Sequence, residues 1–490
     1  MTAPIRVRFA PSPTGMPHIG GIRTALFNYL FARRYGGKFL LRIEDTDVAR
    51  TVEGSVKAIF EGLQWMGLNP DEGPEIGGEF GPYFQSQRLP LYQEAAKKLV
   101  AQGDAYYCYC TPQRLEEMRK EQQAKKLPPG YDRCCRDLTP EERAKKEAAC
   151  TAKVVRFKMP LTGRTQFTDL IRKEVIFENS TLDDHVLLKS DGFPTYHLAN
   201  VVDDRMMQIT HVIRGEEWLS STPRHLLLYR ALGFQPPEFA HLPLILGPDR
   251  SKLSKRHGAA SVKEYAELGY LPDTLFNFMA LTGWSLDDKT ELMSRQEIID
   301  NFSLERISPT AAIFNIEKLK WMNGVYMRKL TPEQFYEYSQ AFLMADRAIA
   351  GMVISDEDYV RSTLPLVQDR ARTLVDVPEL TRFFFVEELE YETKLLVEKD
   401  MTPERALYAL EVSYDRIKDL TPFDAENMEK VLRPLAAELG MKTGHLFGAL
   451  RTATTGRTAA PPLFQTMEVL GKARSLRRIE AAIEKLKHQG

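Results

Sequence analysis

The sequence has few cysteines and no long apolar segment. Five cysteines among 490 residues are few, and their number is odd, which argues against a disulfide framework and indicates a reducing compartment. No run of about 18 apolar residues occurs, so the sequence predicts no membrane-spanning helix. Residues 1–9 resemble a first strand and lack the apolar stretch of a secretion signal. We therefore expect a cytoplasmic protein.

The sequence also lacks an excess of charge of either sign. It carries 66 Lys and Arg against 67 Asp and Glu, a net charge of -1. A strongly basic balance would have indicated a nucleic-acid partner, but a local basic face binds RNA without one. There is no internal repeat or long low-complexity tract. The length predicts about three domains.

A turn rich in Pro and Gly follows the first predicted strand, in the sequence RFAPSPTGMPHIGG from Arg8 to Gly21. His18 stands just before a helix predicted over 22–35, where free N–H groups and the helix dipole favour anions. A strand over 38–43 and a helix over 51–66 follow, and this order predicts a parallel α/β sheet. Taken alone, His-x-Gly is more typical of a capped turn than of a ligand site.

A second segment, KLSKR at 252–256, follows an apolar strand-like stretch and a Gly-Pro-Asp turn. Such a run is usually a solvated loop. Beyond the end of a strand, however, two lysines flanking a serine can neutralise the charge of departing pyrophosphate. The two segments together predict a polyphosphate held from two sides.

Five motifs occur in a fixed order: HIGG at 18–21, RIEDTD at 42–47, YHLANVVDD at 196–204, VIRGEEW at 212–218 and KLSKR at 252–256. They resemble the motifs of class I aminoacyl-tRNA synthetases, with Gly21 in the last place of the HIGH signature. Within that class the chain is similar to bacterial-type glutamyl-tRNA synthetases, and the resemblance extends through essentially the whole chain.

The resemblance implies an α/β Rossmann-like class I catalytic domain with an inserted α+β acceptor-binding module, followed by an all-α anticodon-binding C-terminal half. We expect the catalytic domain over 1–105 and 185–258 and the inserted module over 106–184. A stem-contact region over 259–330 and an α-helical anticodon-binding domain over 331–490 would follow. Strands predicted at 154–158 and 175–177 are assigned to the inserted module.

The activity implied is that of a ligase. L-Glutamate is activated with ATP and Mg²⁺ to glutamyl-adenylate, pyrophosphate leaves, and glutamate passes to the 3′ end of tRNA(Glu). No protein nucleophile is required, so the work is positioning and charge stabilisation. The resemblance implies a monomer, and it leaves open whether tRNA(Gln) is also charged.

Glutamate carries two carboxylates and one ammonium, which two guanidiniums and one acid would complement. Arg8 and Arg214 would supply the guanidiniums and Glu44 the acid. The resemblance implies that Arg8 and Tyr196 face the side-chain carboxylate. Taken singly, Arg8 is equally well a surface residue at a strand end, and Glu44 a helix-capping acid.

The same resemblance places Ser12 with Glu44 at the α-amino group, while Asn200 and Arg214 complete the pocket. It implies His18, Lys252 and Lys255 as the catalytic residues. The residues assigned to ATP are His18, Gly20, Glu217, Trp218, Lys252, Ser254 and Lys255. A core aromatic is the alternative role for Trp218.

The cysteines of the predicted insertion form a Cys108-x-Cys110 pair followed by Cys134 and Cys135. Some relatives bind zinc here with two such pairs, which implies Cys108, Cys110, Cys135 and Asp137 as ligands. Carboxylates are less common than Cys or His in structural zinc sites, and Cys134 is a spare ligand. A metal-free module with buried thiols is an equal alternative.

In the C-terminal half, Arg451 and Leu463 match positions that the family places near the anticodon, and 472–478 offers a local basic face. Two other functions remain: a different nucleotidylyltransferase, and a tRNA-binding paralogue without catalysis. The long helical half disfavours the first, and the intact His18, Lys252 and Lys255 disfavour the second.

Overall fold

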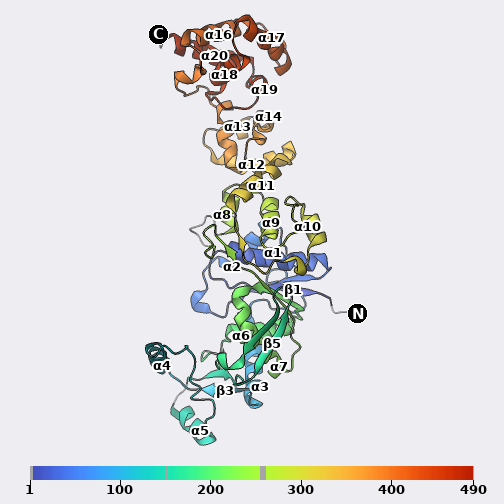
Figure 1. Cartoon of the computed structure of the whole chain (residues 1–490), viewed down its shortest axis with the longest axis vertical. Helices are drawn as coiled ribbons and strands as arrows, with labels where there is room; N and C mark the ends of the chain where they lie inside the picture. Colours follow the sequence, from blue (N-terminus) through green and yellow to red (C-terminus); the bar gives the residue numbers. More distant parts are fainter. Residues whose placement is uncertain (1–3, 150–151, 254–260, 489–490) are drawn as a thin grey trace. The chain divides into compact units, whose positions relative to one another are not determined.

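The computed structural model describes residues 4–149, 152–253 and 261–488. The chain divides into two compact units. Unit 1 comprises 1–265 and 275–315, and unit 2 comprises 266–274 and 316–490. Figure 1 shows the strands in the first part of the chain and helices in the orange and red C-terminal part. Within the described residues, no helix has both the length and the apolarity needed to cross a membrane.

The predicted N-terminal β-α-β unit is present. Strand β1 (Arg6–Phe9) pairs in parallel with β2 (Lys38–Leu41), and α1 (Ile19–Arg34) connects them. All four residues of β1 are buried, as expected for a strand covered on both faces. Strand β8 (His211–Gly215) lies beside β1, because the amide of Thr210 donates to the carbonyl of Arg6 at 2.9 Å.

A four-stranded sheet continues from β8 in the order β6-β5-β9-β8. Strand β9 (Glu238–Leu242) is parallel to both β8 and β5 (Arg164–Asp169), and β6 (Lys173–Glu178) closes a hairpin with β5. We expected the strand at 175–177 in the inserted module. Instead, the β5–β6 hairpin extends the sheet that carries β8 and β9.

A separate antiparallel sheet is made by β3 (Ala105–Cys108), β4 (Val154–Phe157) and β7 (Val186–Leu188). Helices α4 (Pro112–Ala124) and α5 (Pro140–Ala149) lie between β3 and β4 in sequence and have no buried residue. A small core of tyrosines and cysteines, centred on Tyr106, Cys108 and Tyr131, supports this sheet.

Helices cover the sheets of unit 1 and close its main core, in which Tyr92, Leu198 and Leu228 are at most 1% exposed. The remaining helices of this unit are α2 (Ser55–Trp65), α3 (Leu89–Ala101), α6 (Tyr196–Met206), α7 (Thr222–Leu232) and α10 (Arg295–Asn301). Short parallel strands β10 (Ile245–Leu246) and β11 (Ala312–Ile313) pair nearby. Helices α8 (Val262–Glu267) and α9 (Pro272–Leu281) cross the division between the units.

The described part of unit 2 is helical, as predicted. Several of its helices begin at a Thr or Asp whose side chain accepts a backbone N–H, and Thr331 with Gln334 forms a capping box. Its helices are α11 (Ile316–Arg328), α12 (Pro332–Ala345), α13 (Ala350–Ser355), α14 (Glu357–Gln368), α15 (Asp376–Thr381), α16 (Pro403–Ile417), α17 (Ala425–Glu438), α18 (Thr443–Thr455), α19 (Leu463–Leu470) and α20 (Lys472–Lys487). Two apolar cores support them, one over 327–385 with Leu271 and Leu470, and one over 396–486.

Candidate active site

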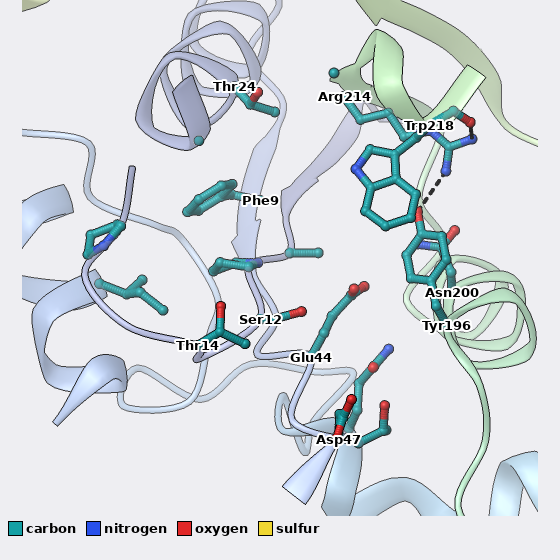
Figure 2. Close-up of a pocket in the computed structure, with 18 of the residues that line it drawn as sticks. Phe9, Ser12, Thr14, Thr24, Glu44, Asp47, Tyr196, Asn200, Arg214 and Trp218 are labelled. Atoms are coloured by element: carbon teal, nitrogen blue, oxygen red, sulfur yellow. Dashed lines mark hydrogen bonds between the residues drawn. The ribbon is translucent and has the colours of Figure 1, made fainter. Parts of the chain in front are cut away.

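A cavity of about 560 Å³ opens in unit 1 where β1, β2 and β8 end. The residues that follow each strand line it: Ser12 after β1, Glu44 after β2 and Glu217 after β8. Ligands of open α/β sheets bind at the carboxyl ends of the strands, so this is the expected place for a substrate. Figure 2 shows side chains from these segments and from α6 around the same space.

The cavity brings together most of the residues predicted from the sequence. Those that line it are Arg8, Ser12, His18, Glu44, Tyr196, Asn200, Arg214, Glu217 and Trp218. Gly21 lines it and Gly20 does not; the amide of Gly20 donates to Nδ1 of the His18 ring. Lys252 is exposed outside the lining, while Ser254 and Lys255 lie outside the described residues.

His18 is the N-cap of α1. The amide of Gly20 donates to its Nδ1 at 3.1 Å, so the neutral ring carries its proton on Nε2. Burial and the charge of Lys252 lower the pKa of His18, against the opposing charge of Glu264. The imidazole is therefore a neutral N–H donor at the N-terminus of a helix, which is suited to a phosphate oxygen.

Arg8 is already paired. Its Nε donates to Asp204 Oδ1 at 3.0 Å and its Nη2 to Oδ2 at 3.3 Å, and both residues are buried. Arg42 donates to the same Asp204 at 2.7 Å and to Glu44 at 3.3 Å. Burial raises the pKa of Asp204, but the two guanidiniums outweigh it and hold that pKa below its usual value.

Glu44 is the acid that remains for a ligand. Its side chain is 9% exposed, and burial raises its pKa although Arg42 and Arg8 act in the opposite direction. A ligand ammonium beside this carboxylate would lower that pKa and stabilise the ionised form. Ser12 and Glu44 line the same cavity (Figure 2), so it offers a hydroxyl acceptor and a carboxylate to a ligand ammonium.

Arg214 differs from Arg8 because all its acceptors are neutral. Its Nη1 donates to Tyr196 Oη at 2.9 Å, its Nη2 to Thr222 Oγ1 at 2.9 Å, and its Nε to a ring nitrogen of His241 at 3.1 Å. It forms no ion pair with any residue that the structure describes. A buried guanidinium without a carboxylate attracts an anionic ligand strongly.

Sequence reasoning missed the acids that organise this cavity. Asp204 stands inside a quoted motif, and its neighbour Asp203 accepts hydrogen bonds from Arg88, Gln85 and Tyr92. Two adjacent acids in an otherwise apolar helical segment were the available signal, because a buried carboxylate requires partners. Lys189 also lines the cavity and donates to the carbonyl of Thr46.

The catalytic-domain model of class I tRNA synthetases (E and Q) matches residues 4–321, and an anticodon binding domain model matches 334–483. The chain belongs to the class I tRNA synthetases for glutamate and glutamine. The chain is 58% identical to a glutamate–tRNA ligase of Dehalococcoides mccartyi over 486 residues, 99% of this chain and 98% of that protein.

Two further relatives match this synthetase over nearly its full length. The chain is 48% identical to a glutamate–tRNA ligase of Moorella thermoacetica, with 98% of each chain covered. The crystal structure of a glutamate tRNA ligase from Elizabethkingia meningosepticum, in complex with its amino acid, superposes with a TM-score of 0.89. That protein is 37% identical, and the match covers 98% of this chain and 99% of the other.

The cysteines of this synthetase gather as predicted, but the fourth predicted ligand does not join them. Sγ atoms of Cys108, Cys110 and Cys135 lie within 4.8 Å of one another. The Sγ of Cys134 is 3.3 Å from that of Cys110. Asp137 is 75% exposed and pairs with Lys158, so the structure does not bring it to the other three predicted ligands.

A phenol occupies the centre of this cysteine cluster. Tyr131 Oη lies 3.2 Å from Cys108 Sγ and 3.5 Å from the Sγ atoms of Cys110 and Cys134. The clustered cysteine thiols are ligands of the kind that Zn²⁺ prefers. Tyr131 was not predicted as a ligand, because a single tyrosine after a Pro-Pro-Gly turn is no recognised metal-binding pattern.

The predicted tRNA-facing residues of unit 2 differ in exposure. Arg451 is half-buried on α18, whereas Leu463 is 5% exposed and packs in the second apolar core. Most cations of the predicted basic face over 472–478 form hydrogen bonds or ion pairs within the helical domain. Its cations donate to carbonyls of Leu420, Phe383, Phe384 and Val386 or pair with Glu387.

Proposed function

We propose that this chain is a glutamate–tRNA ligase, which activates L-glutamate with ATP and transfers it to the 3′ end of tRNA(Glu). The observation that carries the proposal is the charge pattern of the cavity. Arg214 offers a buried guanidinium without a carboxylate partner among the described residues, and Glu44 offers a carboxylate in the same cavity. The full-length identity to glutamate–tRNA ligases supports this assignment.

Glutamate binding follows from these groups. Glu44 and Ser12 accept from the α-ammonium, and Arg8 with Tyr196 faces the side-chain carboxylate. Since Arg214 Nη1 already donates to Tyr196 Oη, the phenol hydrogen of Tyr196 is free to point into the cavity. Asn200, buried and in the lining, completes the pocket with Arg214.

Activation requires a carboxylate oxygen of glutamate to attack the α-phosphorus of ATP, with pyrophosphate as leaving group. His18 Nε2–H and the N-terminus of α1 stabilise the phosphate charge, and Lys252 and Lys255 are proposed to act from the other side. Glu217 and Trp218 are proposed beside the nucleotide. Mg²⁺, when bound with ATP, would screen the phosphate charge. The terminal ribose hydroxyl of tRNA then attacks the mixed anhydride.

We propose zinc as a structural group of the module built on β3, β4 and β7. Cys108, Cys110 and Cys135 would hold it, with Cys134 or Tyr131 as the fourth ligand. Zinc taken up there would stabilise this small core, which has few apolar side chains. The protein purified without added metal should contain about one zinc per chain by elemental analysis, and Cys135→Ser should lose it. Equal zinc content in that variant would contradict the site.

For the tRNA partner, we propose that the helical region over 331–490 binds the anticodon, with Arg451 as a contact residue. The region over 106–184 would contact the acceptor stem and 259–330 the rest of the stem. A monomeric, cytoplasmic enzyme is the form proposed.

The test of the function is glutamate-dependent exchange of pyrophosphate into ATP, measured with and without tRNA, followed by charging of tRNA(Glu) and tRNA(Gln). We expect exchange that depends on tRNA and charging of tRNA(Glu). Absence of exchange under every condition would contradict the ligase, while exchange without charging would indicate another nucleotidylyltransferase.

A further inference from the structure

Two fully buried residues stand behind Arg214 and do not line the cavity. His241, in β9, and Asp169, the last residue of β5, are both 0% exposed. Their side chains meet through a short hydrogen bond of 2.6 Å between His241 Nδ1 and Asp169 Oδ2. The other ring nitrogen of His241 receives the Nε–H of Arg214 at 3.1 Å. A continuous chain therefore runs from Asp169 through His241 to Arg214.

The partners of Asp169 establish its charge. Its Oδ1 accepts backbone N–H groups from Ile171 and Arg172 at 3.0 and 2.9 Å. Burial raises the pKa of Asp169, but the hydrogen bond from His241 and those two amides outweigh it, and the pKa falls below its usual value. Asp169 is therefore an ionised acceptor and cannot donate to the imidazole.

The tautomer of His241 follows from this acceptor. Burial, the largest cause, lowers the pKa of His241 together with the charges of Arg214 and Arg172, against the opposing effect of Asp169, so the ring is neutral. Its single proton is on Nδ1, where Asp169 accepts it, and Nε2 keeps its lone pair. Only this tautomer can accept a hydrogen bond from the Nε–H of Arg214. In the opposite tautomer, Nε2 of His241 would carry a hydrogen that points at the Nε–H of Arg214.

The arrangement also keeps negative charge away from Arg214. A carboxylate placed directly on the guanidinium would offset part of its charge, as Asp204 does for Arg8. His241 instead provides a neutral acceptor and separates Asp169 from Arg214. The ring of Phe239, which stacks on His241 with centroids 6.2 Å apart and lies 5.7 Å from the Arg214 Cζ, holds both groups in place.

We propose that Asp169 and His241 are positioning residues for substrate recognition: Asp169 fixes the His241 tautomer, and His241 orients the Arg214 guanidinium toward the carboxylate of the incoming amino acid. This inference rests on the proposed function for the identity of that ligand. It concerns glutamate and not ATP, because the hydrogen bonds of the His241 ring within the described residues go to Arg214, Thr222 and Asp169, and none goes to the His18 end of the cavity.

Two substitutions of His241 separate positioning from mere packing. In His241→Asn the amide nitrogen can replace Nδ1 and still donate to Asp169, but no acceptor reaches Arg214. In His241→Gln the amide oxygen can replace Nε2 and accept from Arg214, but the Asp169 contact is lost. We expect KM for glutamate to rise about 10- to 100-fold in His241→Asn and to stay within about 3-fold in His241→Gln. KM for ATP should be unchanged in both.

Thermal stability should follow the opposite order, since His241→Gln leaves the buried carboxylate of Asp169 without its ring partner. A purely structural role predicts that KM for glutamate tracks the loss of stability, with His241→Gln the worse enzyme. That result would overturn the proposal, as would an equal KM for glutamate in both variants.

Asp169→Asn provides a spectroscopic readout. The introduced amide can donate to Nδ1, which moves the ring proton to Nε2, as the corresponding change does in the serine-protease triad. Nitrogen-15 spectra of histidine-labelled protein should show His241 protonated on Nδ1 in the unmodified chain and on Nε2 in Asp169→Asn. Protonation on Nε2 in the unmodified chain would overturn the proposal, whether or not the chain is an active ligase. Absence of ligase activity would instead contradict the proposed function.

Discussion

The two units of this chain treat charge in opposite ways. In unit 1, Arg8 and Arg42 converge on Asp204, and side chains of all three are at most 4% exposed. In unit 2, every described ion pair has at least one clearly exposed partner, as in Arg416–Glu438, where both side chains are 48% exposed. Unit 2 depends on two aliphatic and aromatic cores instead.

This difference shows what a buried charge network provides. Burying ions is costly, so hydrophobic packing gives stability more cheaply, as in unit 2. A buried network, however, holds guanidiniums and carboxylates in position before a ligand binds. These groups then need not rearrange during the reaction. The charges are therefore buried where a small charged substrate is recognised, and exposed where the fold only supports a surface.

The largest effect should come from breaking the buried network. Asp204→Asn leaves Arg8 and Arg42 without their shared carboxylate, and we expect the free energy of unfolding to fall by about 3–5 kcal/mol. Glu438→Gln, which removes an exposed ion pair of unit 2, is the matched control and should leave stability unchanged. Denaturant unfolding measures both, and similar losses in the two variants would abolish the contrast between the units.

The second prediction is that each unit recognises a different substrate. Arg214→Ala should lower kcat/KM for glutamate about 100-fold, because a buried guanidinium is removed from the pocket. Arg451→Ala should raise KM for tRNA about 10-fold and leave KM for glutamate unchanged. Steady-state aminoacylation with each substrate varied in turn measures both. A glutamate defect in Arg451→Ala would show that the two units do not divide recognition in this way.

The smallest effect is on pH dependence. The pKa of every described histidine of unit 1 lies below the ordinary value, with burial as the largest cause: His18, His185, His197, His211, His225 and His241. For His197 it falls to about 4. Since the unfolded chain binds protons first, stability is complete above about pH 6.5 and is lost as the pH falls toward 4, by at most about 1.4 kcal/mol per pH unit for each histidine.

Unit 2 has two histidines, and neither is buried. Acid should therefore unfold unit 1 first. Trp65, Trp218 and Trp284 lie in unit 1 and Trp321 in unit 2, so fluorescence of a Trp321→Phe variant follows unit 1 alone. Its melting temperature should fall more steeply below pH 6.5 than that of the helical signal as a whole. Parallel curves would contradict the prediction.

The sequence predicted those site residues whose role arises from their immediate neighbours in the chain. Ser12, His18 and Glu44 stand at turns after strands, where the Pro/Gly pattern and the order of elements indicate a ligand, and all three line the cavity. Asp169 and Asp204 act through partners that are far from them in sequence, His241 and Arg8, so a local pattern cannot show what they bind. The one signal for Asp204 is its place beside a second acid in an otherwise apolar helical segment. Asp137 has a spacing that suits a metal ligand, but its side chain turns outward to Lys158 and lies apart from the cysteines.

The fold shows the same distinction. Helices and strands with clear periodicity were found within a few residues, for example α1 and β4. The sheet to which β5 and β6 belong could not be inferred, because their alternating pattern indicates one exposed face and says nothing about the strand that pairs with it.

The position of the β5–β6 hairpin limits which segments of this enzyme can be exchanged in a chimera. A chimera that exchanges residues 106–184 as one block would replace the hairpin together with the cysteine-bearing sheet, although only the latter stands apart from the sheet of β8 and β9. Strand β9 would then be left as an edge and His241 without Asp169. Module exchange that is meant to alter the acceptor end alone must therefore leave 164–178 in place, even though those residues lie between β4 and β7 in the chain.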